Sequence, residues 1–442
     1  MNNSIKKASA LNLSQSKKLF DRASRSIPGG TQTFSKAPSQ HVAGVSPSVL
    51  QRGSGAKVWD VDGNEYIDYM MSLGPNILGY ADEEIINAAH EAAKLGVVSS
   101  LSHPLECELA ELIIKKIPCA EMVRFGKNGS DVTTAAIRAA RAFTGRDKVV
   151  VCGYHGWHDW YIGSTSRDSG IPDTVQDLTL KFNYNDINSL IKTFEENPES
   201  IAAVIMEPVN FIEPKDNFLE NIKSITRDNG ALLIFDEVIT GFRMDIGGAQ
   251  ANLKVIPDLA CVGKAMANGY PISAIVGRAD IMNVFEDVFF SGTFAGELVS
   301  IAAAISTINA IEERDTLRHI NTLGLHLIQG YNKISEIHSL NKVTEMTGFG
   351  WWPKYSFYDC EGKASPEIQS LFQQEIVRRG ILTRAGIFLC GAHQMEDIEN
   401  TLKIFEEALI VVQEAIKTDN VIAWLDGDVI QPVIRAQATK KV

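Results

Sequence analysis

The chain has 442 residues, 45% hydrophobic and 22% charged, which is typical of a globular protein long enough for two domains. It has 42 basic and 54 acidic residues and a net charge of −12, which argues against a nucleic acid or an anionic membrane as partner. The six cysteines form no C-x-x-C pair, and no signal-like or membrane-spanning apolar stretch is present, so we expect a cytoplasmic protein with reduced thiols.

The first part of the chain predicts one helix and one hairpin. Residues 13–27 have helical periodicity, and the pattern breaks at Pro28-Gly29-Gly30. Between residues 57 and 68, apolar and polar residues alternate on both sides of an Asp-Gly turn, which predicts a β-hairpin.

From about residue 80 to 315, short apolar strands alternate with helices. Helices are expected over 106–117 and 131–143, and strands over 148–152, 201–207, 231–235, 259–262 and 272–276. This alternation predicts an α/β fold with a mostly parallel sheet and helices on both of its faces.

The last part of the chain predicts mainly helices, over 315–338, 366–379 and 396–417. We expect residues 76–315 to form a large domain that binds the ligand. Residues 1–75 and 316–442 are expected to pack together as a smaller domain.

Three elements carry residues suited to chemistry. Gly126 to Asp131 precede an alanine-rich helix, whose first turn either binds a phosphate through free N–H groups or is only capped by Ser130 and Asp131. Asp236 ends a buried strand and either caps a loop or holds a cation. Lys264 follows another strand; it is a nucleophile if burial lowers its pKa, and otherwise a solvated loop lysine.

Together the three elements fit a single ligand. A helix N-terminus suits a phosphate, a carboxylate suits a pyridinium nitrogen, and a lysine suits an aldehyde. These are the three groups of pyridoxal 5'-phosphate.

A longer ordered series of motifs resembles the class III pyridoxal-phosphate aminotransferases, and most closely their glutamate-1-semialdehyde aminomutase branch. The strongest stretch is DEVITGFR, from Asp236 to Arg243, followed later by Gly263-Lys264. The other matching motifs are Ile27-Pro28-Gly29-Gly30, Ala139 to Lys148, Tyr154-His155-Gly156, Gly247-Gly248-Ala249-Gln250, Pro257-Asp258-Leu259 and Gly391-Ala392-His393. The resemblance covers most of the chain and implies a fold-type-I transferase. Its small α+β domain comes from both chain ends.

The resemblance also implies a role for each matching residue. Lys264 forms the internal aldimine and moves the proton, and Asp236 pairs with the pyridine nitrogen. Val238 lies behind the cofactor ring, and Tyr154 stacks on its front face. The other implied cofactor-binding residues are Asn128, Gly129 and Ser130 at the phosphate, Glu207 in the pocket, and Thr293, which reaches the phosphate of the neighbouring subunit in a homodimer.

Some positions depart from the aminomutase pattern. The family's usual Asn-Ser-Gly-Thr before the phosphate helix appears here as Lys127 to Ser130. An Asn-Pro usually follows the second phosphate motif, Ser291-Gly292-Thr293, and Glu297-Leu298 stands there instead. Lys36 follows Pro-Gly-Gly where that branch has an arginine, and Arg384 stands before Ala-Gly where it has an acid. Trp157 adds an aromatic side chain near the cofactor loop. We expect Lys36, Trp157 and Arg384 to contact a substrate such as a larger, partly apolar acid or a sugar.

These departures favour an aminotransferase that moves an amino group from a donor to a keto or aldehyde acceptor through Lys264. The first alternative is an intramolecular 2,1-aminomutase, which needs no separate donor. A racemase, a lyase, or a dimer that has lost its chemistry are further alternatives. The H-x-x-H spacing of His155 and His158 suits neither a metalloprotease helix nor a zinc module, so we expect no metal.

Overall fold

The computed structural model describes residues 7–431, which divide into two compact units. The large unit comprises residues 74–77 and 83–317, and the small unit comprises residues 7–73, 78–82 and 318–431. The domain boundaries expected after residues 75 and 315 stay predictions, and residues 1–6 and 432–442 of the expected small domain lie outside the described part. Among the described helices, none combines the length and the apolar character needed to cross a membrane.

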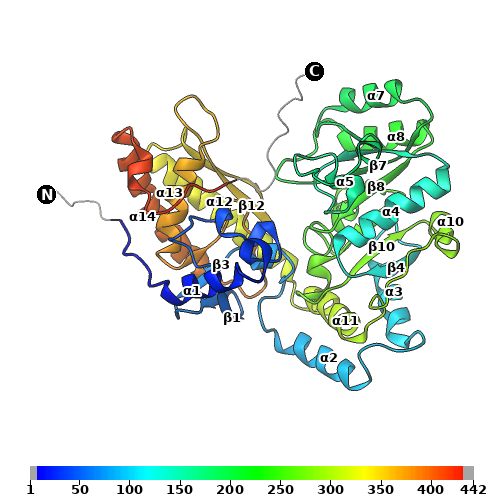
Figure 1. Ribbon diagram of the computed structural model, residues 1–442, viewed down its shortest axis with the longest axis horizontal. Coiled ribbons are helices and arrows are strands. Elements are labelled where there is room, and N and C mark those ends of the chain that lie inside the picture. Colours follow the sequence, from blue (N-terminus) through cyan, green and yellow to red (C-terminus); the bar gives the residue numbers. More distant parts are fainter. Residues whose placement is uncertain (1–6, 432–442) are drawn as a thin grey trace. The chain divides into compact units, whose positions relative to one another are not determined.

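The large unit is built on a seven-stranded sheet with the order β4-β10-β9-β8-β7-β5-β6. Strands β4, β10, β8 and β7 of this sheet are labelled in Figure 1. Only β10 runs against its neighbours β4 and β9, so the predicted, mostly parallel sheet is confirmed. The strands are β4 (Met122–Gly126), β5 (Lys148–Cys152), β6 (Thr179–Lys181), β7 (Ile201–Met206), β8 (Leu232–Glu237), β9 (Leu259–Val262) and β10 (Ser273–Gly277).

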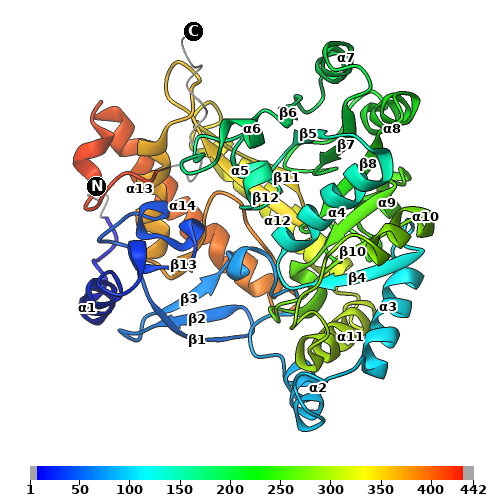
Figure 2. The ribbon, with the colours of Figure 1, turned by 45° about the vertical axis from the view of Figure 1, so that its right-hand side comes forward.

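Both faces of this sheet are buried, as the unbroken apolar runs of β7, β8 and β9 require. On one face, Ile205, Ile234 and Cys261 belong to a core that includes alanines of α4 (Gly129–Thr144). The preceding residues in two of these strands, Val204 and Leu233, point to the other face and are equally buried. Helix α4 therefore lies along the sheet, and it packs against β4, β7, β8, β9 and β10 (Figure 2).

The remaining helices of the large unit surround this sheet. Helices α7 and α8 pack on each other, and α11 packs on α2 and α3. Their bounds are α2 (Glu83–Lys94), α3 (Pro104–Lys116), α5 (Asp159–Ile162), α6 (Asp173–Gln176), α7 (Ile187–Glu196), α8 (Phe218–Asp228), α9 (Gly248–Leu253), α10 (Ala279–Met282), α11 (Leu298–Glu313), and the 3-10 turns η5 (Lys264–Ala267) and η6 (Asn283–Glu286).

The small unit holds a four-stranded sheet with the order β1-β2-β3-β13 and a separate hairpin, β11–β12. The predicted hairpin over 57–68 is confirmed as the antiparallel pair β2–β3. Strand β13 pairs with β3 in parallel although the two are far apart in sequence. The strands are β1 (Leu50–Ser54), β2 (Lys57–Asp60), β3 (Glu65–Asp68), β11 (Thr344–Phe349), β12 (Trp352–Phe357) and β13 (Ile381–Leu382).

The helices of the small unit come from both parts of the chain. The four predicted helices appear within a few residues of their expected ends, as α1 (Ser14–Ala23), α12 (Thr316–Ile337), α13 (Pro366–Val377) and α14 (Met395–Lys417). The short 3-10 turns are η1 (Pro28–Gly30), η2 (Phe34–Lys36), η3 (Pro38–Gln40), η4 (Met71–Leu73) and η7 (Val421–Trp424).

Candidate active site

The carboxyl ends of neighbouring parallel strands bring most of the predicted residues to one edge of the large sheet. Tyr154 follows β5, Glu207 follows β7, Asp236 is near the end of β8, and Lys264 follows β9. These four strands are adjacent in the sheet and pair in parallel up to their ends. The edge they form is where open α/β sheets bind ligands.

Two hydrogen bonds fix the buried carboxylate of Asp236. Its Oδ2 lies 2.8 Å from Nδ1 of His155, and its Oδ1 accepts from the N–H of Val238 at 3.2 Å. A carboxylate oxygen without a proton only accepts, so His155 donates from Nδ1. Nε2 of His155 is buried and has no hydrogen-bond partner among residues 7–431. Within the described residues the imidazole therefore forms its hydrogen bond with Asp236 only, and this bond holds one carboxylate oxygen in place.

The adjacent acid, Glu237, has a different use. It is fully buried, and its carboxylate accepts from Thr240 Oγ1 at 2.7 Å and from the N–H groups of Ala249 and Gln250 at 2.5 and 3.1 Å. These last two N–H groups belong to the first turn of α9. Glu237 thus stabilises the start of a helix, and of the two adjacent acids only Asp236 is left for a ligand.

The backbone and the charge state of Lys264 are both unusual. The residue has φ 41°, in the left-handed region, where a side chain other than glycine costs roughly 1–3 kcal/mol. Burial, and the nearby Arg243 cation, lower the pKa of Lys264, while Asp236 and Glu207 oppose that change. A lowered pKa increases the fraction of neutral amine, which is the nucleophilic form.

The first turn of α4 lies at the same edge, where β4 ends at Gly126. Asp131 accepts from the N–H of Asn128 at 2.7 Å and so fixes the turn. A Cβ on Gly129 would lie 3.1 Å from Val238, and a Cβ on Gly156 would collide with Ser130. The two glycines keep the backbone close to these side chains. The turn presents the N–H groups of Gly129 and Ser130 and a serine hydroxyl, as an anion site does.

The loop after β5 covers this edge. Tyr154 donates its N–H to Glu207 at 3.1 Å, and the residue is 52% exposed. Burial, with a smaller contribution from the Asp236 charge, raises the pKa of Glu207. Trp157 donates its N–H to Ser130 Oγ at 3.3 Å, and the residue is 66% exposed. Two aromatic faces are thus available beside the helix turn.

The two departures in the phosphate motifs contact each other. Lys127 Nζ lies 2.8 Å from Glu297, and both side chains are mostly buried. Glu297 also caps α11, so the ion pair ties the loop 291–297 to the start of α4. Thr293 is exposed on this loop.

Two of the predicted substrate residues belong to the small unit. Lys36 is exposed at the end of η2. Arg384 follows β13 and donates from Nη2 to Gln40 Oε1 at 2.8 Å. Burial lowers the pKa of Arg384, although a guanidinium stays charged at neutral pH.

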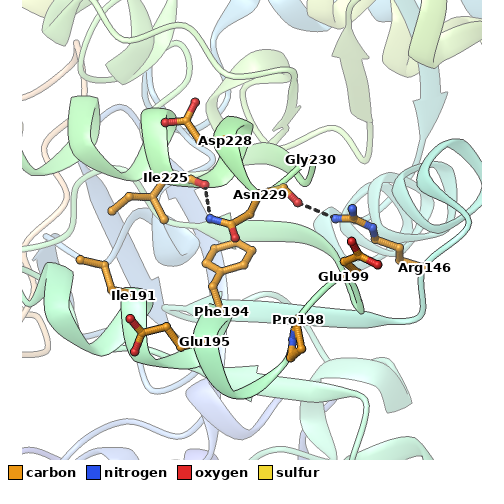
Figure 3. Close-up of a pocket in the computed structure, with 10 residues that line it drawn as sticks. All are labelled: Arg146, Ile191, Phe194, Glu195, Pro198, Glu199, Ile225, Asp228, Asn229 and Gly230. Carbon is orange, nitrogen blue, oxygen red and sulfur yellow. Dashed lines mark hydrogen bonds between the residues drawn. The ribbon is translucent and has the colours of Figure 1, made fainter.

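A groove of about 800 Å³ in the large unit lies away from these residues (Figure 3). Arg146, Glu199 and Gly230 line it, and each of them precedes a strand, β5, β7 or β8, at its amino end. The guanidinium of Arg146 donates a hydrogen bond from Nη1 to the carbonyl of Asn229 at 2.7 Å. The groove is therefore at the opposite edge from Asp236 and Lys264. No group of three or more metal-ligating side chains is found within the described residues.

Sequence reasoning missed two contributors. The sequence shows His155 only as part of the Tyr154-His155-Gly156 motif and of an H-x-x-H spacing, and Arg243 only as the end of the DEVITGFR stretch. The position of His155 just after a buried strand, like that of Asp236 at the end of one, is the signal that would have found it. Arg243 donates to the carbonyl of Gly74 at 2.7 Å and is almost fully buried, which no local pattern indicates.

Comparison with known proteins gives a consistent result. The family described as Aminotransferase class-III matches residues 39–416. The chain is 36% identical over 417 residues to the 3-aminobutyryl-CoA aminotransferase of Cloacimonas acidaminovorans (strain Evry), which covers 92% of this chain and 99% of that one. The FumI protein of Sphingopyxis sp. MTA144, solved in its PLP internal aldimine form, has a TM-score of 0.85 and 31% identity over 91% of this chain and 97% of its own. An omega-transaminase from Sphaerobacter thermophilus has a TM-score of 0.82 and 28% identity, over 90% of this chain and 98% of its own.

The hydrogen bond from His155 to Asp236 yields a first prediction. Replacing His155 by leucine should lower the turnover number by about 10- to 100-fold, as removal of an orienting partner does, without loss of folding. His155→Asn keeps an N–H donor close to the position of Nδ1 and should restore part of the rate. His158 bonds Thr134 instead, so His158→Leu is the matched control. Steady-state kinetics would contradict the role if His155→Leu turned over like the wild type, or if both leucine variants lost rate equally.

Proposed function

The chain belongs to the class III aminotransferases, and from that premise we propose that Lys264 and Asp236 hold pyridoxal 5'-phosphate at the carboxyl edge of the large sheet. The enzyme transfers an amino group from a donor to a keto or aldehyde acceptor and uses pyridoxal 5'-phosphate to do so. The observation that carries the assignment of residues is the placement of a buried, histidine-bound carboxylate and a lysine of lowered pKa at the ends of adjacent strands.

The residues at this edge fit the cofactor's three groups. An amine of lowered pKa suits its aldehyde, a fixed carboxylate suits its ring nitrogen, and a glycine-lined helix turn suits its phosphate. When bound, pyridoxal phosphate supplies an aldehyde that joins covalently to amines and a ring that draws electrons from the carbon beside the nitrogen.

Lys264 serves as the covalent anchor and as the base. Its Nζ would hold the cofactor's aldehyde. With a substrate amine in that place, Nζ would be the base that takes the proton from the substrate carbon bearing nitrogen and returns it elsewhere. The left-handed backbone of Lys264 sets the direction of the side chain for this task.

Asp236 would keep the ring nitrogen protonated by offering it a negative charge. His155 fixes Oδ2, while Oδ1 has only a 3.2 Å bond to the backbone and remains available. The charge of Asp236 and its fixed direction together make the ring a stronger electron acceptor.

The rest of the pocket positions the cofactor. Asn128, Gly129 and Ser130 would hold the phosphate at the first turn of α4. Val238, which is close to Gly129, and Tyr154 would pack on the faces of the ring. The last of the proposed cofactor contacts is Glu207, beside Tyr154.

We further propose that the donor carries its amino group on the carbon β to a carboxyl or thioester carbonyl. The similarity to a 3-aminobutyryl-CoA aminotransferase supports this class of donor. Arg384 and Lys36 are proposed to bind a carboxylate of the donor or acceptor, and Trp157 an apolar part of it.

A glutamate-1-semialdehyde type of aminomutase is the second candidate, because its chemistry uses the same lysine and aspartate. Such an enzyme needs no separate acceptor, because it moves the amino group from one carbon to the neighbouring carbon of the same substrate. The reversed charge at Arg384 favours intermolecular transfer.

We also propose a cytoplasmic homodimer in which Thr293 reaches the phosphate of the neighbouring subunit. The loop that carries Thr293 exposes Phe294, which is 62% exposed, and nearby Phe289 is 78% exposed. The N–H of Leu298 donates to Val97 in a second segment with exposed apolar residues, including Leu101 at 85%. Apolar surface of this kind supports contact with a second copy.

Replacing Lys264 by alanine should abolish covalent attachment of the cofactor and reduce turnover by roughly 100- to 10,000-fold, because both anchor and base are lost. The measurements are the visible absorption spectrum and the turnover number. Lys192→Ala removes an exposed lysine of α7 and serves as the control. Wild-type turnover by Lys264→Ala would contradict the mechanism.

Arg384→Met should raise the concentration of 3-aminobutyrate that half-saturates the first half-reaction by about 10- to 100-fold, because a charged hydrogen bond is lost. The half-saturating concentration of the neutral analogue 2-aminobutane should be the same for Arg384→Met as for the wild type. The rate of change of the visible absorption band, without any acceptor, measures both amines. Arg22→Met, an exposed change on α1, is the control. Equal effects on the two amines would refute a carboxylate contact.

Mixed dimers test the role of Thr293. A Lys264→Ala subunit paired with a Thr293→Val subunit forms one intact site if Thr293 acts across the dimer. The affinity of that hybrid for pyridoxal phosphate should then equal the wild type, whereas Thr293→Val homodimers bind about 10-fold more weakly. A hybrid as weak as the Thr293→Val homodimer would place Thr293 in its own subunit's site, and a monomeric protein would exclude the arrangement.

A further inference from the structure

A C-terminal segment of the small unit, which we term the strap (residues 424–431), is held along the unit by a series of hydrogen bonds. It lies beyond residue 416, where the family match ends. Asp426 pairs with Arg378 at 2.8 Å, and its N–H donates to Gln374 at 2.7 Å. Further along, the N–H groups of Ile430 and Gln431 donate to Ser370 Oγ at 3.0 Å and to the carbonyl of Ser39 at 2.8 Å.

The last residue of the strap is linked to Arg384 by one buried side chain. Gln40 is 6% exposed, and its Nε2 donates to the carbonyl of Gln431 at 2.6 Å. Its Oε1 accepts from Arg384 Nη2 at 2.8 Å. A guanidinium only donates and a carbonyl only accepts, so chemistry alone fixes the orientation of this amide. Both ends of Gln40 are therefore committed to these two partners.

Arg384 has neutral partners only. Besides Gln40, it lies 3.5 Å from the carbonyl of Ser35, and within the described part of the chain no carboxylate pairs with it. Burial, together with the Arg384 charge, lowers the pKa of the neighbouring His41 to about 4, so His41 is neutral at pH 7. A partly buried cation without a counter-charge is poised for an anionic ligand.

We infer that the strap, acting through Gln40, positions the guanidinium of Arg384 and thereby sets the enzyme's affinity for the anionic group of its substrate. Gln40 is a positioning residue in this arrangement, and the carbonyl of Gln431 is its anchor. The inference rests on the proposed carboxylate contact of Arg384.

The choice of glutamine follows from this arrangement. A glutamate at position 40 would repel the Gln431 carbonyl and would neutralise Arg384 as an ion pair, which removes its use for a substrate. A methionine would fill the same space and leave Arg384 charged but free to turn. The neutral amide holds the cation without consuming its charge.

The experiment uses the full-length holoenzyme and compares 3-aminobutyrate with 2-aminobutane in the first half-reaction. Gln40→Met should raise the half-saturating concentration of 3-aminobutyrate about 10-fold, as loss of an orienting partner does. Gln40→Glu should raise it further, towards the value of Arg384→Met. The maximal rates and the reaction of 2-aminobutane should not change.

A second variant displaces the strap without touching Gln40 or Arg384. A Cβ on Gly427 would collide with the carbonyl of Ala43, so Gly427→Ala pushes the strap outward and should reproduce the Gln40→Met phenotype. Gly362→Ala is the control, because position 362 has φ +77° but open space around it, and the change strains the small unit away from the strap. That control should leave the ratio between the two amines unchanged.

The outcomes separate the inference from its premise. If Arg384→Met discriminates between the amines and the Gln40 and Gly427 variants do not, the strap has no role in binding. If Arg384→Met itself affects both amines equally, the proposed carboxylate contact is wrong and the inference falls with it. If Gly427→Ala and Gly362→Ala change the ratio alike, the effect is general strain and the inference is also overturned.

Discussion

The structure of the candidate site depends on a carboxylate buried at the end of a strand that is itself buried on both faces. Burying a charge is costly unless it is hydrogen-bonded or paired. Asp236 meets this need with His155 at one oxygen and the N–H of Val238 at the other. The parallel order of β5, β7 and β8 is what brings His155 and Asp236 to the same edge.

The other residues at this edge act on that fixed point. Lys264 lies one strand away, and burial lowers the pKa of its amine while the Asp236 charge opposes the effect. At the helix turn, Lys127 and Glu297 replace two neutral positions of the family pattern by an ion pair. Because each residue neutralises the other, the exchange leaves the local charge unchanged, and it ties the Thr293 loop to the turn.

Much of this could be predicted from local patterns, and the rest depends on contacts between distant residues. Unbroken apolar runs gave β5, β7 and β9, and the residues at strand ends gave Asp236 and Lys264. The partner of Asp236, however, is 81 positions away, and Gln40 is 344 positions from Arg384 and 391 from Gln431. Strand β13 has only two residues and is defined by its pairing with β3, so no alternation of apolar and polar residues in the sequence predicts it.

The most direct test of the account is to find which lysine carries the cofactor. The holoenzyme is reduced with borohydride and digested with trypsin, and the masses of its peptides are measured by mass spectrometry. The account predicts that the phosphopyridoxyl group is attached to the peptide 255–278, in which Lys264 is the only internal lysine. Attachment to a different lysine, or no attachment to a protein that retains its activity, would contradict it.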